Sequence, residues 1–168
     1  MADKKTIENL KAAFAGESQA NRKYTYFAEK ADAEGFKQVA KLFRAAAHAE
    51  AVHAKNHLKA LAGIMGTADN LQAAIGGEDY EVADMYPGFI DEARLEEEKK
   101  ALRSFEWAYE VEKVHAALYR QALAGLGGEQ EEGDYYVCPV CGYTHFGPMT
   151  EEKCPVCGTP TERFEKIG

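Results

Sequence analysis

Two copies of a Glu-x-x-His motif constrain this 168-residue chain more than any other feature. The copies stand 62 residues apart, and a further glutamate precedes them by 33 and 34 residues. The residues are Glu17, then Glu50 with His53, then Glu78, and finally Glu112 with His115. A helical bundle that holds two metal ions uses this ligand set, with one glutamate from each of two helices and a Glu-x-x-His from each of the other two. The pattern therefore predicts a dinuclear metal site inside a four-helix bundle.

Four segments carry apolar residues at helical spacing, over residues 7–31, 36–61, 71–93 and 102–126. Gly35 and Gly63 follow the first two segments, and glycine commonly ends a helix. Either Asp69 or Asn70 is expected to cap the third helix. That helix should be kinked or interrupted, because Gly76-Gly77 and Pro87-Gly88 oppose a regular helix interior. A long connection before it is expected to cross the bundle.

The second half of the helical region repeats the first. Residues 13–17 resemble residues 74–78 at an offset of 61, and five later residues recur at an offset of 62. These five are Phe27, Phe43, Glu50, His53 and Ala54, which recur as Phe89, Phe105, Glu112, His115 and Ala116. A duplicated helix pair predicts an approximate two-fold axis, across which two ions would have nearly equal ligands.

The predicted ligands lie on the apolar stripes of their helices, so they should point inward. Residues three or four apart share a helix face, and each glutamate has apolar neighbours at that spacing. Buried unpaired carboxylates cost several kcal/mol each, against a net domain stability of ~5–15 kcal/mol. Two divalent ions would balance the four negative charges. Carboxylate and imidazole ligands suit iron or manganese and do not exclude zinc.

Other titratable residues near the motifs are less constrained by their spacing. Glu81 lies one turn after Glu78, so it could be a fifth carboxylate of the site or a surface residue. His48 and His57 are expected to be partner or surface residues.

All four cysteines lie near the end of the chain as two Cys-Pro-Val-Cys-Gly repeats. They are Cys138, Cys141, Cys154 and Cys157, with 12 residues between the repeats. Four thiolates in two such pairs predict a tetrahedral metal site for zinc or iron. A structural zinc ribbon is the alternative to an iron centre that transfers electrons.

Composition predicts two domains and narrows the class of protein. Helix-forming residues dominate up to about residue 126, and Gly, Pro, Cys and Tyr concentrate afterwards, so residues 1–130 and 131–168 are the predicted domains.

A net charge of −8 argues against binding nucleic acid. Because no apolar run approaches ~18 residues and the start has no secretory signal, no membrane association is expected. The clustered cysteines favour a reducing, cytoplasmic setting.

With both metal signatures in this order, the chain closely resembles the rubrerythrin family. The resemblance includes residues 13–20, Met85-Tyr86-Pro87, both Glu-x-x-His motifs and the short gap between the cysteine pairs. It implies a mainly α fold, with a ferritin-like four-helix bundle followed by a small rubredoxin-like domain. It also implies iron at both sites: a dinuclear centre with Glu and His ligands, and one iron held by the four cysteine thiolates.

The resemblance also assigns roles to individual residues. Its di-iron ligands fall on Glu17, Glu50, His53, Glu78, Glu81, Glu112 and His115. Glu50 and Glu112 would bridge the ions, and Glu81 would replace a histidine on one iron in the oxidised state. Tyr24 and Tyr86 match tyrosines that hydrogen-bond the ligands.

The implied activity is reduction of hydrogen peroxide to water, as a cytoplasmic defence against oxidative stress. Electrons would come from an external NAD(P)H-dependent reductase or a rubredoxin, because the chain has no nucleotide-binding fingerprint. A homodimer or larger assembly is implied, in which the cysteine domain of one subunit serves the bundle of its neighbour. Residues 94–99 lack the glycine common at this turn, which leaves open whether helices swap between subunits.

Two other functions remain open from the sequence. The bundle would permit a ferroxidase or iron-handling protein. Zinc at the cysteines would instead favour a redox sensor or binding module without turnover.

Overall fold

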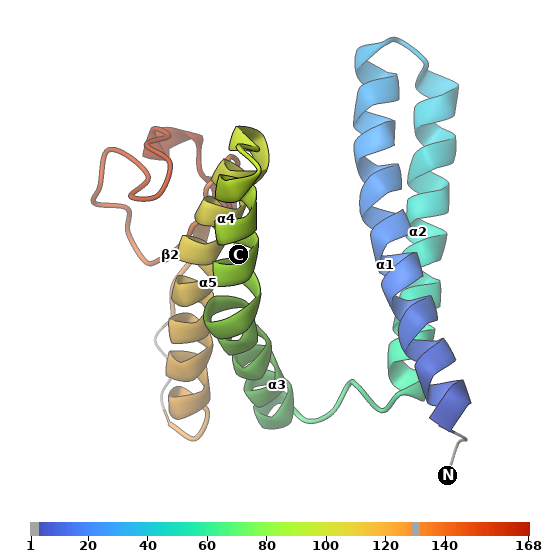
Figure 1. The fold of residues 1–168 in the computed structure, drawn as a ribbon, viewed down its shortest axis with the longest axis horizontal. Coiled ribbons are helices and arrows are strands. Elements are labelled where there is room, and N and C mark those ends of the chain that lie inside the picture. The colour runs from blue at the N-terminus through green and yellow to red at the C-terminus, as the bar shows by residue number, and fades with distance from the viewer. Residues whose placement is uncertain (1–3, 129–131) are drawn as a thin grey trace. The chain divides into compact units, whose positions relative to one another are not determined.

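The computed structural model describes residues 4–128 and 132–168. The chain divides into two compact units, Met1–Met65 and Gly66–Gly168 (Figure 1). The predicted domain boundary between residues 130 and 131 lies outside the described residues. Within the described ranges, no helix is long and apolar enough to cross a membrane.

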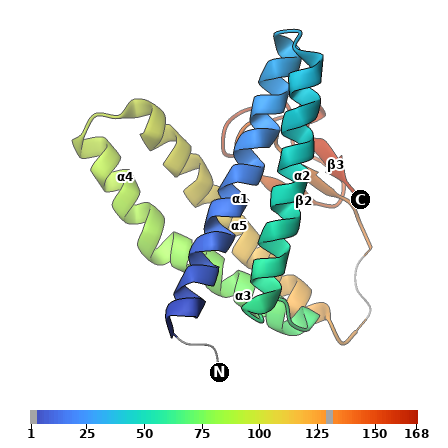
Figure 2. The ribbon, with the colours of Figure 1, turned by 90° about the vertical axis from the view of Figure 1, so that its right-hand side faces the viewer.

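The first unit is a helical hairpin. Helices α1 (Lys4–Ala33) and α2 (Lys37–Ala60) lie side by side along their length (Figure 2). Gly35 has a φ of +85°, a conformation that glycine adopts without steric cost, so α1 ends where the sequence predicts. The Asn21 side-chain amide donates a hydrogen bond to the Ala47 carbonyl at 2.7 Å and ties the helices together.

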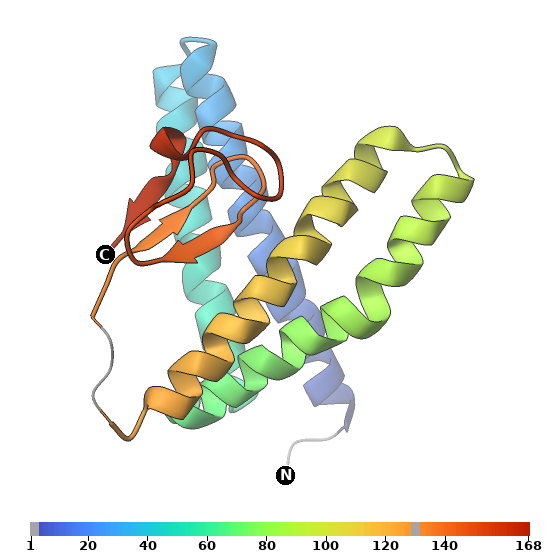
Figure 3. The same ribbon diagram turned by 90° about the vertical axis from the view of Figure 1, so that its left-hand side faces the viewer.

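The second unit begins with another helical hairpin (Figure 3). One arm runs from α3 (Thr67–Tyr80) through the π-helical turn η1 (Glu81–Met85) into α4 (Tyr86–Leu95). The other arm is α5 (Lys99–Gly125), which packs against all three.

Three expectations about the third helix need correction. It begins at Thr67 after Gly66, without a side-chain cap, so neither Asp69 nor Asn70 caps it. The expected interruption is confirmed as the π-helical turn just before Pro87, but Gly76-Gly77 lies inside regular α3. Proline is tolerated there because α4 begins at that point. The connection from α2 is short, spanning only residues 61–66.

The turn between α4 and α5 copies the turn of the first hairpin, although it has no glycine. Glu97 takes a positive φ of +57° at the position equivalent to Gly35. Its backbone hydrogen bonds also match, since Phe36 N–H donates to Ala31 O at 2.8 Å and Glu98 N–H donates to Ala93 O at 3.0 Å. The missing glycine therefore raises the conformational free energy of the turn but does not change its geometry.

Repeated side-chain clusters reinforce both hairpins. In the first, Phe27 and Phe43 have ring centroids 5.6 Å apart, with Tyr24 beside both at 6.3 and 6.2 Å. In the second, Phe89 and Phe105 are also 5.6 Å apart, with Tyr86 at 6.4 Å from each. An ion pair between the two helices occurs at equivalent positions of both hairpins, with the charges reversed. It joins Asp32 to Arg44 at 2.6 Å in the first hairpin and Arg94 to Glu106 at 2.8 Å in the second.

The chain ends in a small antiparallel sheet of order β2-β1-β3. The strands are β1 (Tyr135–Val137), β2 (Thr144–Phe146) and β3 (Glu165–Ile167), and a 3₁₀ turn η2 (Thr161–Arg163) precedes β3. Tyr136 pairs with His145 on one side and Lys166 on the other. We call residues 132–168, which hold this sheet and the four cysteines, the cysteine module. Strand β2 lies against α5.

Candidate metal sites

The first hairpin brings Glu17, Glu50 and His53 together. Helix α1 supplies Glu17, and α2 supplies the other two on one face. Their ligand atoms lie within 4.8 Å of one another. His53 Nδ1 is 2.9 Å from Glu50 Oε2 and 4.0 Å from Glu17 Oε1. The cluster offers two carboxylates and one imidazole nitrogen to a cation.

The second hairpin repeats this arrangement with Glu78, Glu112 and His115. His115 Nδ1 is 2.6 Å from Glu112 Oε2 and 3.9 Å from Glu78 Oε1, close to the distances in the first hairpin. The side chains of Glu78 and Glu112 are 16% and 18% exposed. In both hairpins Nδ1 faces the carboxylates, so it is the nitrogen that would bind a metal.

Electrostatics indicate that the second cluster suits a cation. Burial, followed by the negative charge of Glu112, raises the pKa of Glu78 to about 7. The hydrogen bond to Glu112 raises the pKa of His115, although burial opposes it. Ionising both carboxylates at neutral pH costs free energy, and a positive charge between them offsets that cost. The donor set therefore fits a divalent iron, manganese or zinc ion.

Glu81 begins the π-helical turn and lies outside the three-residue cluster. The pKa of Glu81 is nevertheless raised by burial and then by the charge of Glu112, so Glu81 lies near the second cluster. A π-helical turn adds one residue to a helix, and such turns are frequent at functional sites. This extra residue accounts for the repeat offset, which is 61 at Glu78 and 62 from Tyr86 onward. The change of offset was the sequence signal for the turn.

Two tyrosines, Tyr86 and Tyr119, lie near the second cluster. Burial, followed by the charge of Glu81, raises the pKa of Tyr86 and keeps its phenol protonated. Tyr119 has its pKa raised by burial and then by Glu78, yet sequence reasoning placed it only in the apolar stripe. It lies four residues after His115 on the same helix face, which was the available signal. In the first hairpin, Tyr24 packs against Phe27 and Phe43.

The remaining histidines of the bundle take no part in these clusters. Among the described residues, neither His48 nor His57 belongs to a group of possible metal ligands. His48 is exposed and His57 is half-buried, in line with the surface or partner role expected for them.

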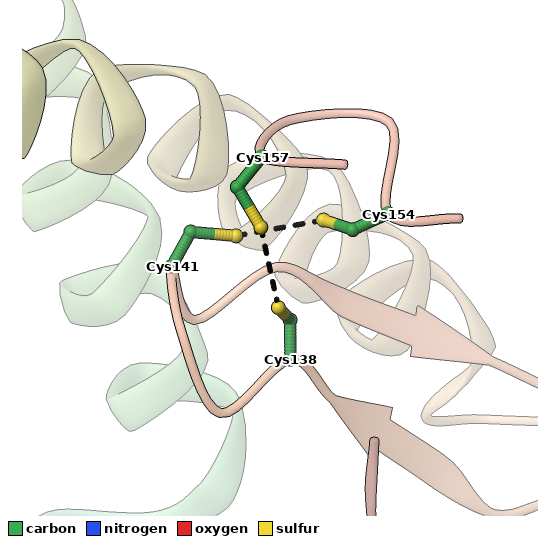
Figure 4. Close-up of side chains that lie close together, drawn as sticks. All are labelled: Cys138, Cys141, Cys154 and Cys157. Carbon is green, nitrogen blue, oxygen red and sulfur yellow. Dashed lines mark hydrogen bonds between the residues drawn. The ribbon is translucent and has the colours of Figure 1, made fainter. Parts of the chain in front are cut away.

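The four cysteine sulfurs converge on one point (Figure 4). Cys138 Sγ is 3.6 Å from Cys157 Sγ, and Cys141 Sγ is 3.5 Å from Cys154 Sγ. A tetrahedral ion with metal–sulfur bonds of about 2.3 Å needs sulfurs about 3.8 Å apart, so the cluster is close to the size required.

The two cysteine pairs are built alike. The N–H groups of Gly142 and Gly158 donate to the carbonyls of Cys138 and Cys154 at 3.0 and 2.9 Å. Both glycines have positive φ values, +83° and +75°, which a side chain at either position would strain. Each turn therefore holds its two sulfurs toward the same point.

The thiols differ in how readily they ionise. Burial raises the pKa of Cys141 and of Cys154. Burial also acts to raise the pKa of Cys157, but hydrogen bonds from Thr159 and the neighbouring thiols lower it to about 7. Four adjacent thiolates, two of them buried, repel one another without a cation, so metal binding and proton release are coupled here.

Comparison with known proteins gives matches to both the helical part of the chain and the cysteine module. Residues 8–123 match the family model described as Rubrerythrin, and residues 136–165 match the Rubrerythrin, rubredoxin-like domain. Rubrerythrin-2 of Clostridium acetobutylicum is 36% identical, with 95% of each chain covered. Rubrerythrin of Porphyromonas gingivalis is 38% identical, covering 97% of this chain and 90% of that protein.

Solved structures of related proteins also match nearly the whole chain. The fully reduced, all-ferrous state of nigerythrin is 36% identical and covers 99% of this chain and 89% of its own, with a TM-score of 0.59. These matches confirm the predicted fold class, a mainly helical four-helix part followed by a small four-cysteine domain. The chain belongs to the rubrerythrin family.

Proposed function

We propose that this protein is a peroxidase that reduces hydrogen peroxide, with iron in both kinds of site. One peroxide takes two electrons and two protons and leaves as two waters. The observation that best supports this proposal is that β2 of the cysteine module lies against α5, the helix of Glu112 and His115. The four cysteines, which would hold the one-electron centre, thus belong to a module that lies against the helix of these ligands. Membership of the rubrerythrin family supports the same activity.

The six clustered Glu and His residues are the proposed ligands of an iron pair, and Glu81 would supply a further carboxylate. When bound, the irons would supply the two electrons that cleave the oxygen–oxygen bond, so that no hydroxyl radical need be released. The carboxylates neutralise the positive charge of the ions. Tyr86 keeps its proton, so its O–H can donate a hydrogen bond toward the site carboxylates.

The four cysteines are the proposed holders of a single iron that delivers electrons one at a time. We propose an external NAD(P)H-dependent reductase or a rubredoxin as the donor to this centre. An assembly of at least two chains, with or without exchanged helices, is part of the same proposal, as is a cytoplasmic location.

Anaerobic stopped-flow spectroscopy tests this function. The reduced, iron-loaded protein is mixed with hydrogen peroxide or with dioxygen while the visible absorption of the thiolate-bound iron is followed. Return of that absorption much faster with peroxide is the expected result. No preference for peroxide, together with mineral formation from added ferrous iron, would instead indicate a ferroxidase. A protein that binds only zinc at the cysteines and shows no such band would indicate a sensor or structural module.

A further inference from the structure

Thr159 is a buried polar residue beside one of the four cysteine sulfurs. Its hydroxyl oxygen lies 3.1 Å from Sγ of Cys157, the last cysteine of the cluster. Thr159 is 8% exposed, and in the described part of the chain no other polar or charged residue is as well buried. A hydroxyl group at such a position almost always has a hydrogen-bond partner, and the sulfur provides one.

The two cysteine pairs differ at this position. After the first pair, the Tyr143 carbonyl accepts from the Cys138 N–H at 2.9 Å. After the second pair, the Thr159 carbonyl accepts from the Cys154 N–H at 2.8 Å, so Tyr143 and Thr159 are equivalent. The ring of Tyr143 packs against Phe164, with ring centroids 6.4 Å apart. Among the described residues, only Thr159 brings a side-chain hydroxyl within hydrogen-bond distance of a cysteine sulfur.

The sulfur must accept this hydrogen bond once a metal is bound. Cysteine binds metal as a thiolate, which has no hydrogen to donate. The hydroxyl of Thr159 is therefore the donor, and the acceptor carries negative charge. Such charge-assisted hydrogen bonds are stronger than neutral ones, and the low polarity of a buried position strengthens them further.

We propose that Thr159 is a positioning residue that acts through Cys157 to raise the reduction potential of an iron held by the four cysteines. Reduction adds one electron to this group, and the four sulfurs share the added negative charge. A hydrogen-bond donor at sulfur stabilises the more negative state, and such bonds are among the features that set the potentials of iron–thiolate sites. The inference rests on the proposed function, whose external donor supplies the electron. Thr159 thus makes the cysteine module a better electron acceptor from that donor.

Redox titration of the thiolate-bound iron in the full-length protein tests this role. The visible absorption of the ferric form is followed while the applied potential is lowered, for wild type, Thr159→Val and Thr159→Ser. Valine keeps the shape of threonine without the donor, and serine keeps the hydroxyl. We expect Thr159→Val to shift the equilibrium on the order of tenfold toward ferric iron, which corresponds to about 59 mV for one electron, and Thr159→Ser to restore most of it. A Thr159→Val potential equal to that of wild type would overturn the proposal.

Thr161→Val is the matched control for a general loosening of the module. The Thr161 hydroxyl donates to the carbonyl of Glu151 at 2.6 Å, so this variant loses a hydrogen bond of the same module that involves no sulfur. Its reduction potential should stay at the wild-type value. An equal shift in both valine variants would refute the role of Thr159, because loosening alone would then explain the shift.

Cadmium NMR tests the hydrogen bond without electron transfer. Full-length protein is loaded with ¹¹³Cd²⁺, and the resonance of the ion with four sulfur ligands is compared among the same four proteins. Because its chemical shift depends on the electron density at the sulfurs, we expect Thr159→Val to move this resonance and Thr159→Ser to return it toward wild type. Thr161→Val should leave it in place. Identical resonances in wild type and Thr159→Val would show that the hydroxyl does not donate to Cys157.

These results also separate the inference from the proposed function. If iron-loaded wild type does not react with peroxide but the potentials differ as expected, the peroxidase proposal fails and the role of Thr159 stands. If wild type reacts with peroxide and the Thr159→Val potential is unchanged, the role of Thr159 fails alone. If the cysteines take zinc and no iron, the redox role fails together with the proposed function, and the cadmium resonances still decide the hydrogen bond.

Discussion

Replacing Glu78 by glutamine should stabilise the protein when the carboxylate–histidine site holds no metal. The carboxyl of Glu78 is 16% exposed and lies beside the charge of Glu112, and burial followed by that charge raises its pKa from 4.5 to about 7. Ionisation of a group with a raised pKa favours the unfolded chain. The stability of the wild type is therefore full below pH 4.5 and falls as pH rises toward 7.

The size of this stabilisation follows from the pKa shift of Glu78. Each pKa unit corresponds to about 1.4 kcal/mol, so the penalty removed by Glu78→Gln should approach about 3 kcal/mol at pH 8. At pH 5.5, where the folded-state carboxyl is still mostly protonated, it should be about 1 kcal/mol. The glutamine amide can still donate a hydrogen bond to Glu112, as the protonated acid does.

Urea unfolding followed by far-UV circular dichroism measures this difference. The protein is stripped of metal and given one equivalent of zinc, which the four thiolates should take in preference to the carboxylates. Glu92→Gln, an exposed glutamate on α4, is the matched control and should change stability little at either pH. With excess ferrous iron the order should reverse, because the carboxylate is then a ligand.

A stability difference that does not grow between pH 5.5 and 8 would refute this reasoning. So would a Glu78→Gln protein less stable than wild type at pH 8 without metal. Either result would mean that burial and the charge of Glu112 do not disfavour ionisation of Glu78 in the folded protein.

Three further outcomes are expected. Glu97→Gly should stabilise the α4–α5 turn by up to about 1 kcal/mol in urea unfolding, because glycine relieves the positive φ but is freer in the unfolded chain; a destabilised variant would contradict this. Asn21→Ala should cost about 1 kcal/mol by leaving the Ala47 carbonyl without its side-chain donor, and an unchanged urea midpoint would count against that contact. Cys157→Ser should abolish the visible iron–thiolate band and leave far-UV helicity nearly unchanged; a retained band would exclude Cys157 as a ligand.

Prediction of the site from sequence succeeded where the geometry is local to a helix. A Glu-x-x-His pair lies on one face of any α-helix, so Glu50 and His53, and likewise Glu112 and His115, converge without knowledge of the tertiary fold. The cysteine pairs are similar, because a short turn fixes the separation of each pair of sulfurs. Spacing left Glu81 undecided, because its position depends on the π-helical turn that follows α3.

Helical periodicity thus determined the helical segments and the two Glu-x-x-His pairs, and the Cys-x-x-Cys spacing determined the two cysteine pairs, because each depends on residues close together in the chain. Only the tertiary structure decided the geometry of the Glu97 turn and the contact between His115 and Thr144, residues that lie 29 positions apart. A positive φ at a glutamate is favoured by the packing of the hairpin around it and not by its own preference. The His115 contact requires the cysteine module to dock on α5, and no pattern within either segment encodes that docking.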